Sequence, residues 1–131
     1  MPSEISKLTE LRELYLDYNN LKIFPAEIST LKNLQLLNLN DNDLKIIPAE
    51  IGNLTNLQYF EVGRNYLTSL PTELGNFSNL LVLNIAYCGQ SIKIPESIGN
   101  STGLQYLYID HWMELPNSIY KNKGLQVIIK Q

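Results

Sequence analysis

Few residues in this chain of 131 have the types and spacing that perform chemistry. Its only histidine, His111, follows Asp110, and such a pair can act as a general acid and base when a nucleophile lies beside it. No motif places a serine, threonine or cysteine nucleophile next to this pair. The sequence therefore predicts no catalytic site.

Asp41 and Asp43, in the stretch NLNDNDL, have the spacing with which carboxylates begin a calcium-binding loop. That loop also needs a glycine and a terminal glutamate at fixed offsets, and the sequence has neither. Zinc-ligand spacings and phosphate-binding loops do not occur either. We therefore expect no metal ion and no cofactor.

Cys88 is the only cysteine, so no disulfide can form within the chain. Its neighbours in the sequence include no lysine, arginine or histidine that would lower the pKa of the thiol. We expect Cys88 to pack as a structural residue, and the alternative is a reactive thiol.

The overall charge and hydrophobicity exclude some partners. Ten lysines and arginines against thirteen acids give a net charge of -3, which argues against nucleic acid as a partner. The sequence contains no run of eighteen apolar residues, so it predicts no insertion into a membrane. The first residues, MPSEISKLTE, do not form a signal peptide, and the sequence leaves the compartment open between the cytoplasm and the exterior.

The elements that position these residues come from a repeat. Prolines stand at positions 2, 25, 48, 71, 95 and 116, which are steps of 23, 23, 23, 24 and 21 residues. Such a period, carried along the whole chain, predicts a solenoid of stacked units.

One unit reads L-x-x-L-x-L-x-x-N-x-L-x-x-L-P-x-E-I-x-x-L. In LQLLNLN, Leu37 and Leu39 alternate with outward residues, which is the period-two pattern of a strand. After Pro48, Ile51 and Leu54 are three residues apart, which is typical of a short helical turn.

These letters resemble the leucine-rich repeat family over residues 2–128, most closely its L-P-x-E-I class of bacterial repeat proteins and Ras-associated scaffolds. The resemblance implies an α/β fold, a right-handed solenoid bent into an arc. A parallel β-sheet lines its concave side, and short helical or 3-10 turns form its convex side. We expect one domain over residues 1–131, the C-terminal part of a longer protein.

The turn after each strand carries an asparagine that must find partners for its amide when buried. The resemblance implies an asparagine ladder, in which each amide bonds to the backbone of the neighbouring loops. The predicted ladder residues are Asn19, Asn42, Asn65 and Cys88.

Both ends depart from the repeat. Repeat five is two residues short and has Trp112 at the ladder position. Aligned with it, the last repeat LQVIIKQ puts Val127 in an outward column and Lys130 in a core column. The first repeat begins without a cap, so we expect an open N-terminal end and possible self-association through it.

Outward strand positions are not fixed by the repeat, and six of the eight tyrosines fall there or at the strand exits. Tyrosine is enriched at protein interfaces because it joins apolar area to a polar tip. Five acids accompany one clear base, Arg64, so we expect a basic or aromatic-rich partner. The predicted contact residues are Tyr15, Tyr18, Leu36, Tyr59, Glu61, Arg64, Val82, Tyr87, Tyr106, Tyr108, Asp110 and His111.

The sequence thus predicts a non-catalytic module that binds a protein or peptide with its concave face. Two alternatives stay open. In the first, the chain is a structural segment of a larger surface or receptor protein whose binding site lies elsewhere. In the second, it is the substrate-recognition part of an enzyme such as a bacterial ubiquitin ligase.

Overall fold

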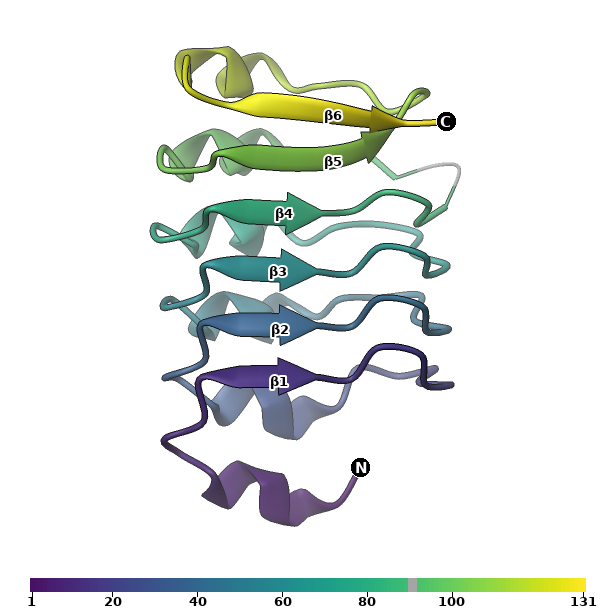
Figure 1. Ribbon diagram of the computed structural model, residues 1–131, viewed down its shortest axis with the longest axis vertical. Helices are drawn as coiled ribbons and strands as arrows, with labels where there is room; N and C mark the ends of the chain where they lie inside the picture. Colours follow the sequence, from purple (N-terminus) through teal and green to yellow (C-terminus); the bar gives the residue numbers. More distant parts are fainter. Residues whose placement is uncertain (90–91) are drawn as a thin grey trace.

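The structure, a computed structural model, describes residues 1–89 and 92–131. Strands and 3-10 helices alternate along the chain and stack from the N-terminus to the C-terminus (Figure 1). The strands are β1 (Glu13–Tyr15), β2 (Leu36–Asn38), β3 (Tyr59–Glu61), β4 (Val82–Asn84), β5 (Tyr106–Asp110) and β6 (Gln126–Lys130). The 3-10 helices are η1 (Ser3–Lys7), η2 (Ala26–Thr30), η3 (Ala49–Asn53), η4 (Thr72–Asn76), η5 (Glu96–Asn100) and η6 (Asn117–Lys121).

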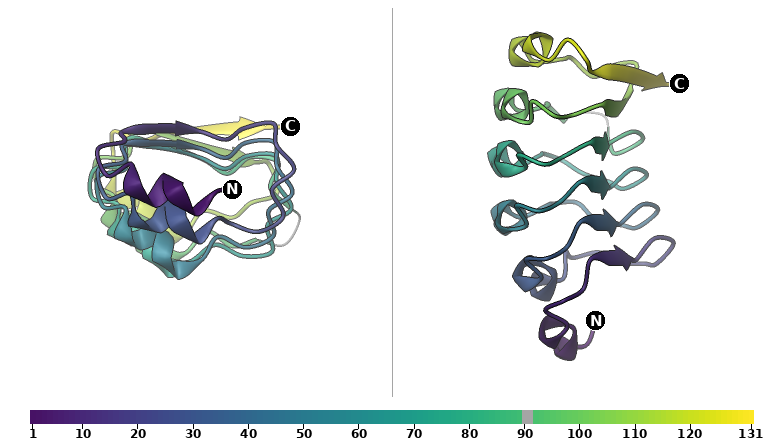
Figure 2. Two further views of the ribbon diagram at one scale, coloured as in Figure 1. Left: turned by 90° about the horizontal axis from the view of Figure 1, so that it is seen from below. Right: turned by 60° about the vertical axis from the view of Figure 1, so that its left-hand side comes forward.

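All six strands belong to one open parallel sheet in the order β1-β2-β3-β4-β5-β6. Each strand pairs with the same position of the next repeat, so Leu37 lies beside Leu14 on one side and Phe60 on the other. The 3-10 helices line up on the opposite side of the solenoid (Figure 2). This is the arrangement that the leucine-rich repeat resemblance predicts, and the fold prediction is confirmed.

Proline starts every outer turn. Pro48 is extended, with φ -73° and ψ 158°, and its carbonyl accepts the N–H of Ile51 at 3.1 Å. The Leu54 N–H then bonds to the Ile51 carbonyl at 3.1 Å and closes the turn. A ring that fixes φ and removes an N–H suits this place, because the first turn has no partner for that donor.

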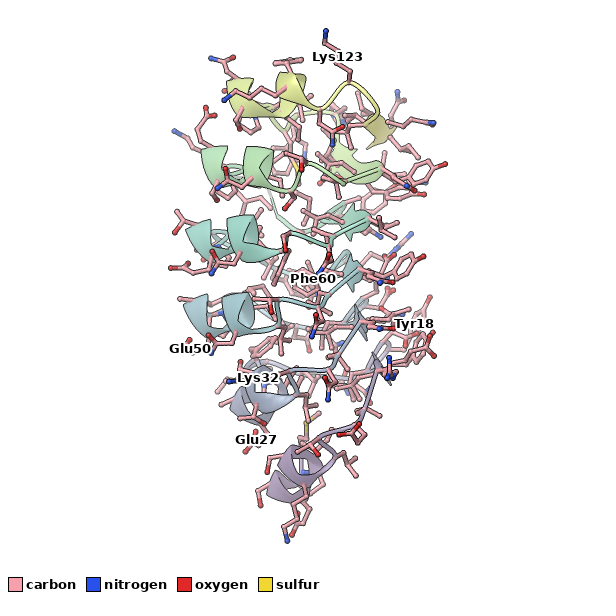
Figure 3. All side chains as sticks on the ribbon, turned by 90° about the vertical axis from the view of Figure 1, so that its left-hand side faces the viewer. Tyr18, Glu27, Lys32, Glu50, Phe60 and Lys123 are labelled. Carbon is pink, nitrogen blue, oxygen red and sulfur yellow. The ribbon has the colours of Figure 1, made fainter. Side chains whose placement is uncertain are left out.

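The core lies between the sheet and the outer turns, where Figure 3 shows Phe60. Phe60 and Phe77 are fully buried and meet edge to face, with ring centroids 6.0 Å apart. Neither repeat could bury its ring alone, so stacking of the repeats supplies the burial that stabilises the fold.

The N-terminal end is partly covered. Leu11, Leu14 and Leu16 are half-buried and pack against the core, together with Ile5 of η1. Leu8 remains 53% exposed. Self-association through this end stays a prediction.

At the C-terminal end the predicted register is wrong by one residue. Tyr106 pairs with Gln126 and Leu107 pairs with Val127, so Val127 takes the core column instead of the outward one. Lys130 lies opposite Asp110 and is exposed, which corrects its predicted core position. The strands pair with a step of 20 residues, one fewer than the 21-residue spacing of Leu104 and Leu125 predicts, so the outer turn of repeat five takes up less chain than that spacing indicates.

Among the described residues, no helix has the length and apolar character that a membrane crossing needs.

Candidate binding face

The outward side of the sheet, which we call the concave face, carries two columns of side chains. The first column holds Glu13, Leu36, Tyr59, Val82, Tyr106 and Gln126, and the second holds Tyr15, Asn38, Glu61, Asn84, Tyr108 and Ile128. Tyr15 is 57% exposed and Tyr59 38%, whereas Tyr106 and Tyr108 are half-buried. Leu36 and Val82 are half-buried between them. The structure therefore brings the predicted contact residues of the sheet onto one surface.

Glu61 lies at the centre of this face and is held by its neighbours. Its carboxylate accepts the side-chain amides of Asn84 at 2.9 Å and Asn40 at 3.3 Å. Asn40 in turn accepts the backbone N–H of Gly63 at 2.6 Å. This network fixes the orientation of Glu61, whose carboxylate is held on the surface with two amides beside it.

A row of four residues follows the strands, and we call it the exit ridge: Tyr18, Asp41, Arg64 and Tyr87. All four have left-handed backbone conformations, with φ of 55°, 57°, 54° and 59°. This region costs a residue with a side chain about 1 kcal/mol. Tyr18 is 78% exposed and points away from the body of the solenoid (Figure 3).

Arg64 interacts with both neighbours on the ridge. Its Nε lies 4.0 Å from the Asp41 carboxylate, and its guanidinium carbon lies 4.9 Å from the centre of the Tyr87 ring. The Arg64 side chain is 63% exposed, so the ion pair adds little to stability. The contacts position the guanidinium above the ring without burying it.

Asp110 and His111 bond to different parts of the chain. Asp110 is only 5% exposed, and its carboxylate accepts the backbone N–H of Tyr87 at 2.8 and 3.0 Å. It is thus not the exposed acid that the sequence pattern suggests, because it completes the turn after β4. His111 is exposed, and its backbone N–H donates to the Lys130 carbonyl at 3.2 Å.

The asparagines make the hydrogen bonds that a ladder requires. The amide of Asn42 donates to the carbonyls of Leu16, Leu39 and Asn40 at 2.9 to 3.2 Å, and its oxygen accepts the N–H of Leu21 at 3.1 Å. Asn65 repeats this pattern one unit further on. Asn19, at the open end, is exposed and bonds only within its own turn.

Cys88 continues the ladder with its thiol, whose Sγ lies 2.8 Å from the Val62 carbonyl. Burial raises the pKa of this thiol from 9.0 to about 12. A thiol that stays protonated at neutral pH is a poor nucleophile, so the structure favours the packing role.

A second ladder escaped the sequence interpretation. The amides of Asn33, Asn56 and Asn79 donate to carbonyls of the preceding repeat at 2.8, 2.9 and 3.3 Å. The signal was present, because an asparagine stands before the strand leucine in three successive repeats. Gly103 ends the series.

Lys130 and Tyr66 are further surface residues that the sequence interpretation missed. The Lys130 ammonium lies 5.5 Å from the centre of the Tyr108 ring, on the concave face. Tyr66 is 65% exposed and lines an open groove of about 510 Å³ beside the exit ridge. Among the described residues, no group of three or more His, Cys, Asp or Glu is placed to hold a metal ion.

Comparison with known proteins gives a consistent result. The family model for Leucine Rich Repeat matches residues 10–31 and 33–54. A leucine-rich repeat protein of Leptospira interrogans shares 37% sequence identity at a TM-score of 0.85, over 98% of this chain and 33% of that one. The comparison with curated proteins gave no match.

Two plant receptors are also similar. The peptide hormone receptor RGFR1, solved with RGF2, shares 36% identity at a TM-score of 0.86, over 98% of this chain and 22% of that one. The Arabidopsis receptor kinase HAESA ectodomain, solved with an IDA peptide hormone, shares 29% identity at a TM-score of 0.84, over 99% and 24%. This chain thus spans a third or less of the length of these three proteins. The repeated sequence and the family match on two repeats show that the chain contains leucine-rich repeats, and the shared solenoid shows that it has their fold.

Proposed function

We propose that the chain is a non-catalytic module that binds a protein or peptide with its concave face. The observation that carries this proposal is the gathering of exposed tyrosines, Tyr15 and Tyr59 on the sheet with Tyr18 and Tyr87 beside it. The free energy falls when a partner covers an exposed aromatic ring and removes its apolar surface from water.

The neighbours support the class of partner. RGFR1 and HAESA were each solved with a peptide hormone, and this chain shares their fold. Six strands about 4.8 Å apart give a surface roughly 25 Å across, which an extended segment of about eight residues would span.

The charges of the concave face suggest what the partner carries. Glu13 is exposed and Asp17 half-buried at the N-terminal half of the face, whereas Lys130 lies at the C-terminal half. A partner with basic and apolar groups suits the first half. Its attraction to these two acids should weaken as salt is added.

Selection from a displayed library of random eight-residue peptides tests the proposal. Peptides that bind should lose affinity for the Tyr15→Ser/Tyr59→Ser variant and keep it for Tyr120→Ser, whose ring is 67% exposed on the convex η6. Thermal unfolding of both variants shows that the fold is kept. If no peptide is enriched, or if Tyr120→Ser alone abolishes binding, the concave face is not the binding site.

A further inference from the structure

The groove beside the exit ridge lies outside the two sheet columns. One wall is the exit ridge, and the other is the next column of the same turns, with Asn20, Asp43 and Tyr66. Its rim holds three exposed tyrosines, because Tyr18 is 78%, Tyr66 65% and Tyr87 41% exposed. Two carboxylates, Asp41 and Asp43, lie among these rings.

The groove already holds one guanidinium. Arg64 lies between the carboxylate of Asp41, one repeat below, and the ring of Tyr87, one repeat above. A carboxylate and an aromatic face are the two groups that attract a guanidinium, the first by its charge and the second by its quadrupole. The contacts of Arg64 thus show that this groove can hold a guanidinium between a carboxylate and a tyrosine ring.

Asp43 lines the same groove as Asp41. Within the described residues, no lysine, arginine or histidine nitrogen lies within 4.0 Å of its carboxylate. Tyr66 stands one repeat further along in the same column, 23 positions later, with its ring exposed. A carboxylate and a ring are also the partners of Arg64, although Asp41 and Tyr87 stand two repeats apart, with Arg64 in the repeat between them.

We propose that this groove binds an arginine side chain of a partner polypeptide, between Asp43 and Tyr66. Two carboxylates against the single Arg64 leave the groove net negative, which complements a cation. Arginine suits it better than lysine, because a planar guanidinium stacks on a tyrosine ring while it bonds to a carboxylate. The groove runs along the stack and is open, so the chain that carries the arginine can pass through it.

This site is separate from the sheet columns, so its test does not depend on binding by Tyr15 and Tyr59. The probe is the capped tripeptide acetyl-Ala-Arg-Ala-amide, titrated into the isotopically labelled protein and followed by amide chemical shifts. Its matched control replaces arginine with citrulline, which keeps the shape and removes the charge.

We expect saturable shifts at the amides of residues 41–43 and 64–66 with the arginine peptide and much weaker ones with the citrulline peptide. Asp43→Asn should lower the association constant about fivefold, as loss of an exposed charge pair does. Glu50→Gln makes the same change of charge on the convex η3 and should leave the constant unchanged.

Tyr66→Ser should weaken binding as well, while the Arg64 contacts remain. Equal binding of the citrulline peptide, shifts confined to other residues, an unaffected Asp43→Asn variant or the absence of any shift would each overturn the proposal. None of these results bears on the concave face, which the peptide selection tests independently.

Discussion

The carboxylate of Asp110 accepts the backbone N–H of Tyr87 through both of its oxygens, at 2.8 and 3.0 Å. Elsewhere on the exit ridge a backbone carbonyl takes this bond, as when the N–H of Arg64 donates to the carbonyl of Ala86 at 2.9 Å. A side chain therefore replaces the peptide group as the acceptor in the turn after β4.

Asp110→Ala should lower the free energy of unfolding by about 1–3 kcal/mol, because the Tyr87 N–H loses its acceptor in a partly buried turn. Chemical denaturation measures the change. Asp17→Ala removes the acid at the corresponding position of the first repeat, where no such bond is made, and should cost clearly less. Equal losses for the two variants would show that the bond does not stabilise the turn.

Asn42→Ala should cost about 1–3 kcal/mol, because the Leu21 N–H loses its acceptor and the carbonyls of Leu16, Leu39 and Asn40 each lose one of their donors. Asn19→Ala is the control, since its amide is exposed and bonds only within its own turn. Thermal unfolding of the two variants should separate them. A parent-like Asn42→Ala would contradict the role of the ladder.

Gly63→Ala should destabilise the centre of the sheet by about 1–3 kcal/mol through overpacking. A Cβ at Gly63 would lie 2.9 Å from the Ala86 carbonyl oxygen and 3.1 Å from the Asn84 side-chain oxygen. Gly103→Ala is matched to it, because its nearest neighbour would be the Leu80 oxygen at 3.9 Å. Denaturation curves that are the same for both variants would mean that the strands move apart without cost.

Cys88 should resist thiol reagents in the folded protein at pH 8 and react on unfolding. Burial raises the pKa of the folded thiol from 9.0 to about 12, so the unfolded chain loses this proton first. Stability from this group is therefore complete below pH 9 and decreases as the pH rises from 9 to 12. Rapid labelling of the native protein would contradict the buried position.

The repeat allowed the strands, their columns and the ladder to be predicted, since residues such as Leu37 and Asn42 recur at a fixed period. The last strand was not predictable in this way. Its register depends on how many residues the shortened outer turn needs, and the period gives no measure of that. The burial of Asp110 was hidden for a related reason: an acid at an outward position looks exposed until the neighbouring turn supplies an N–H to it.

The role of Asn56 was missed for a different reason. Its amide bonds to a carbonyl of the preceding repeat, so its role depends on contact between units and not on the letters of one unit. Tyr66 was missed because it follows the ladder residue, outside the columns that the strand pattern singles out. The candidate groove therefore emerges only when the turns are stacked.

On the exit ridge, backbone atoms make the hydrogen bonds between repeats, whereas side chains such as that of Tyr18 are exposed. Tyr18, Asp41 and Arg64 join the stack by donating their backbone N–H groups to the carbonyls of Asn40, Gly63 and Ala86. Every residue except proline supplies that donor, and glycine would even relieve the left-handed conformation. The side chains of the ridge can consequently be substituted together while the backbone hydrogen bonds of the turns are kept. The same scaffold can then present a surface of different chemistry.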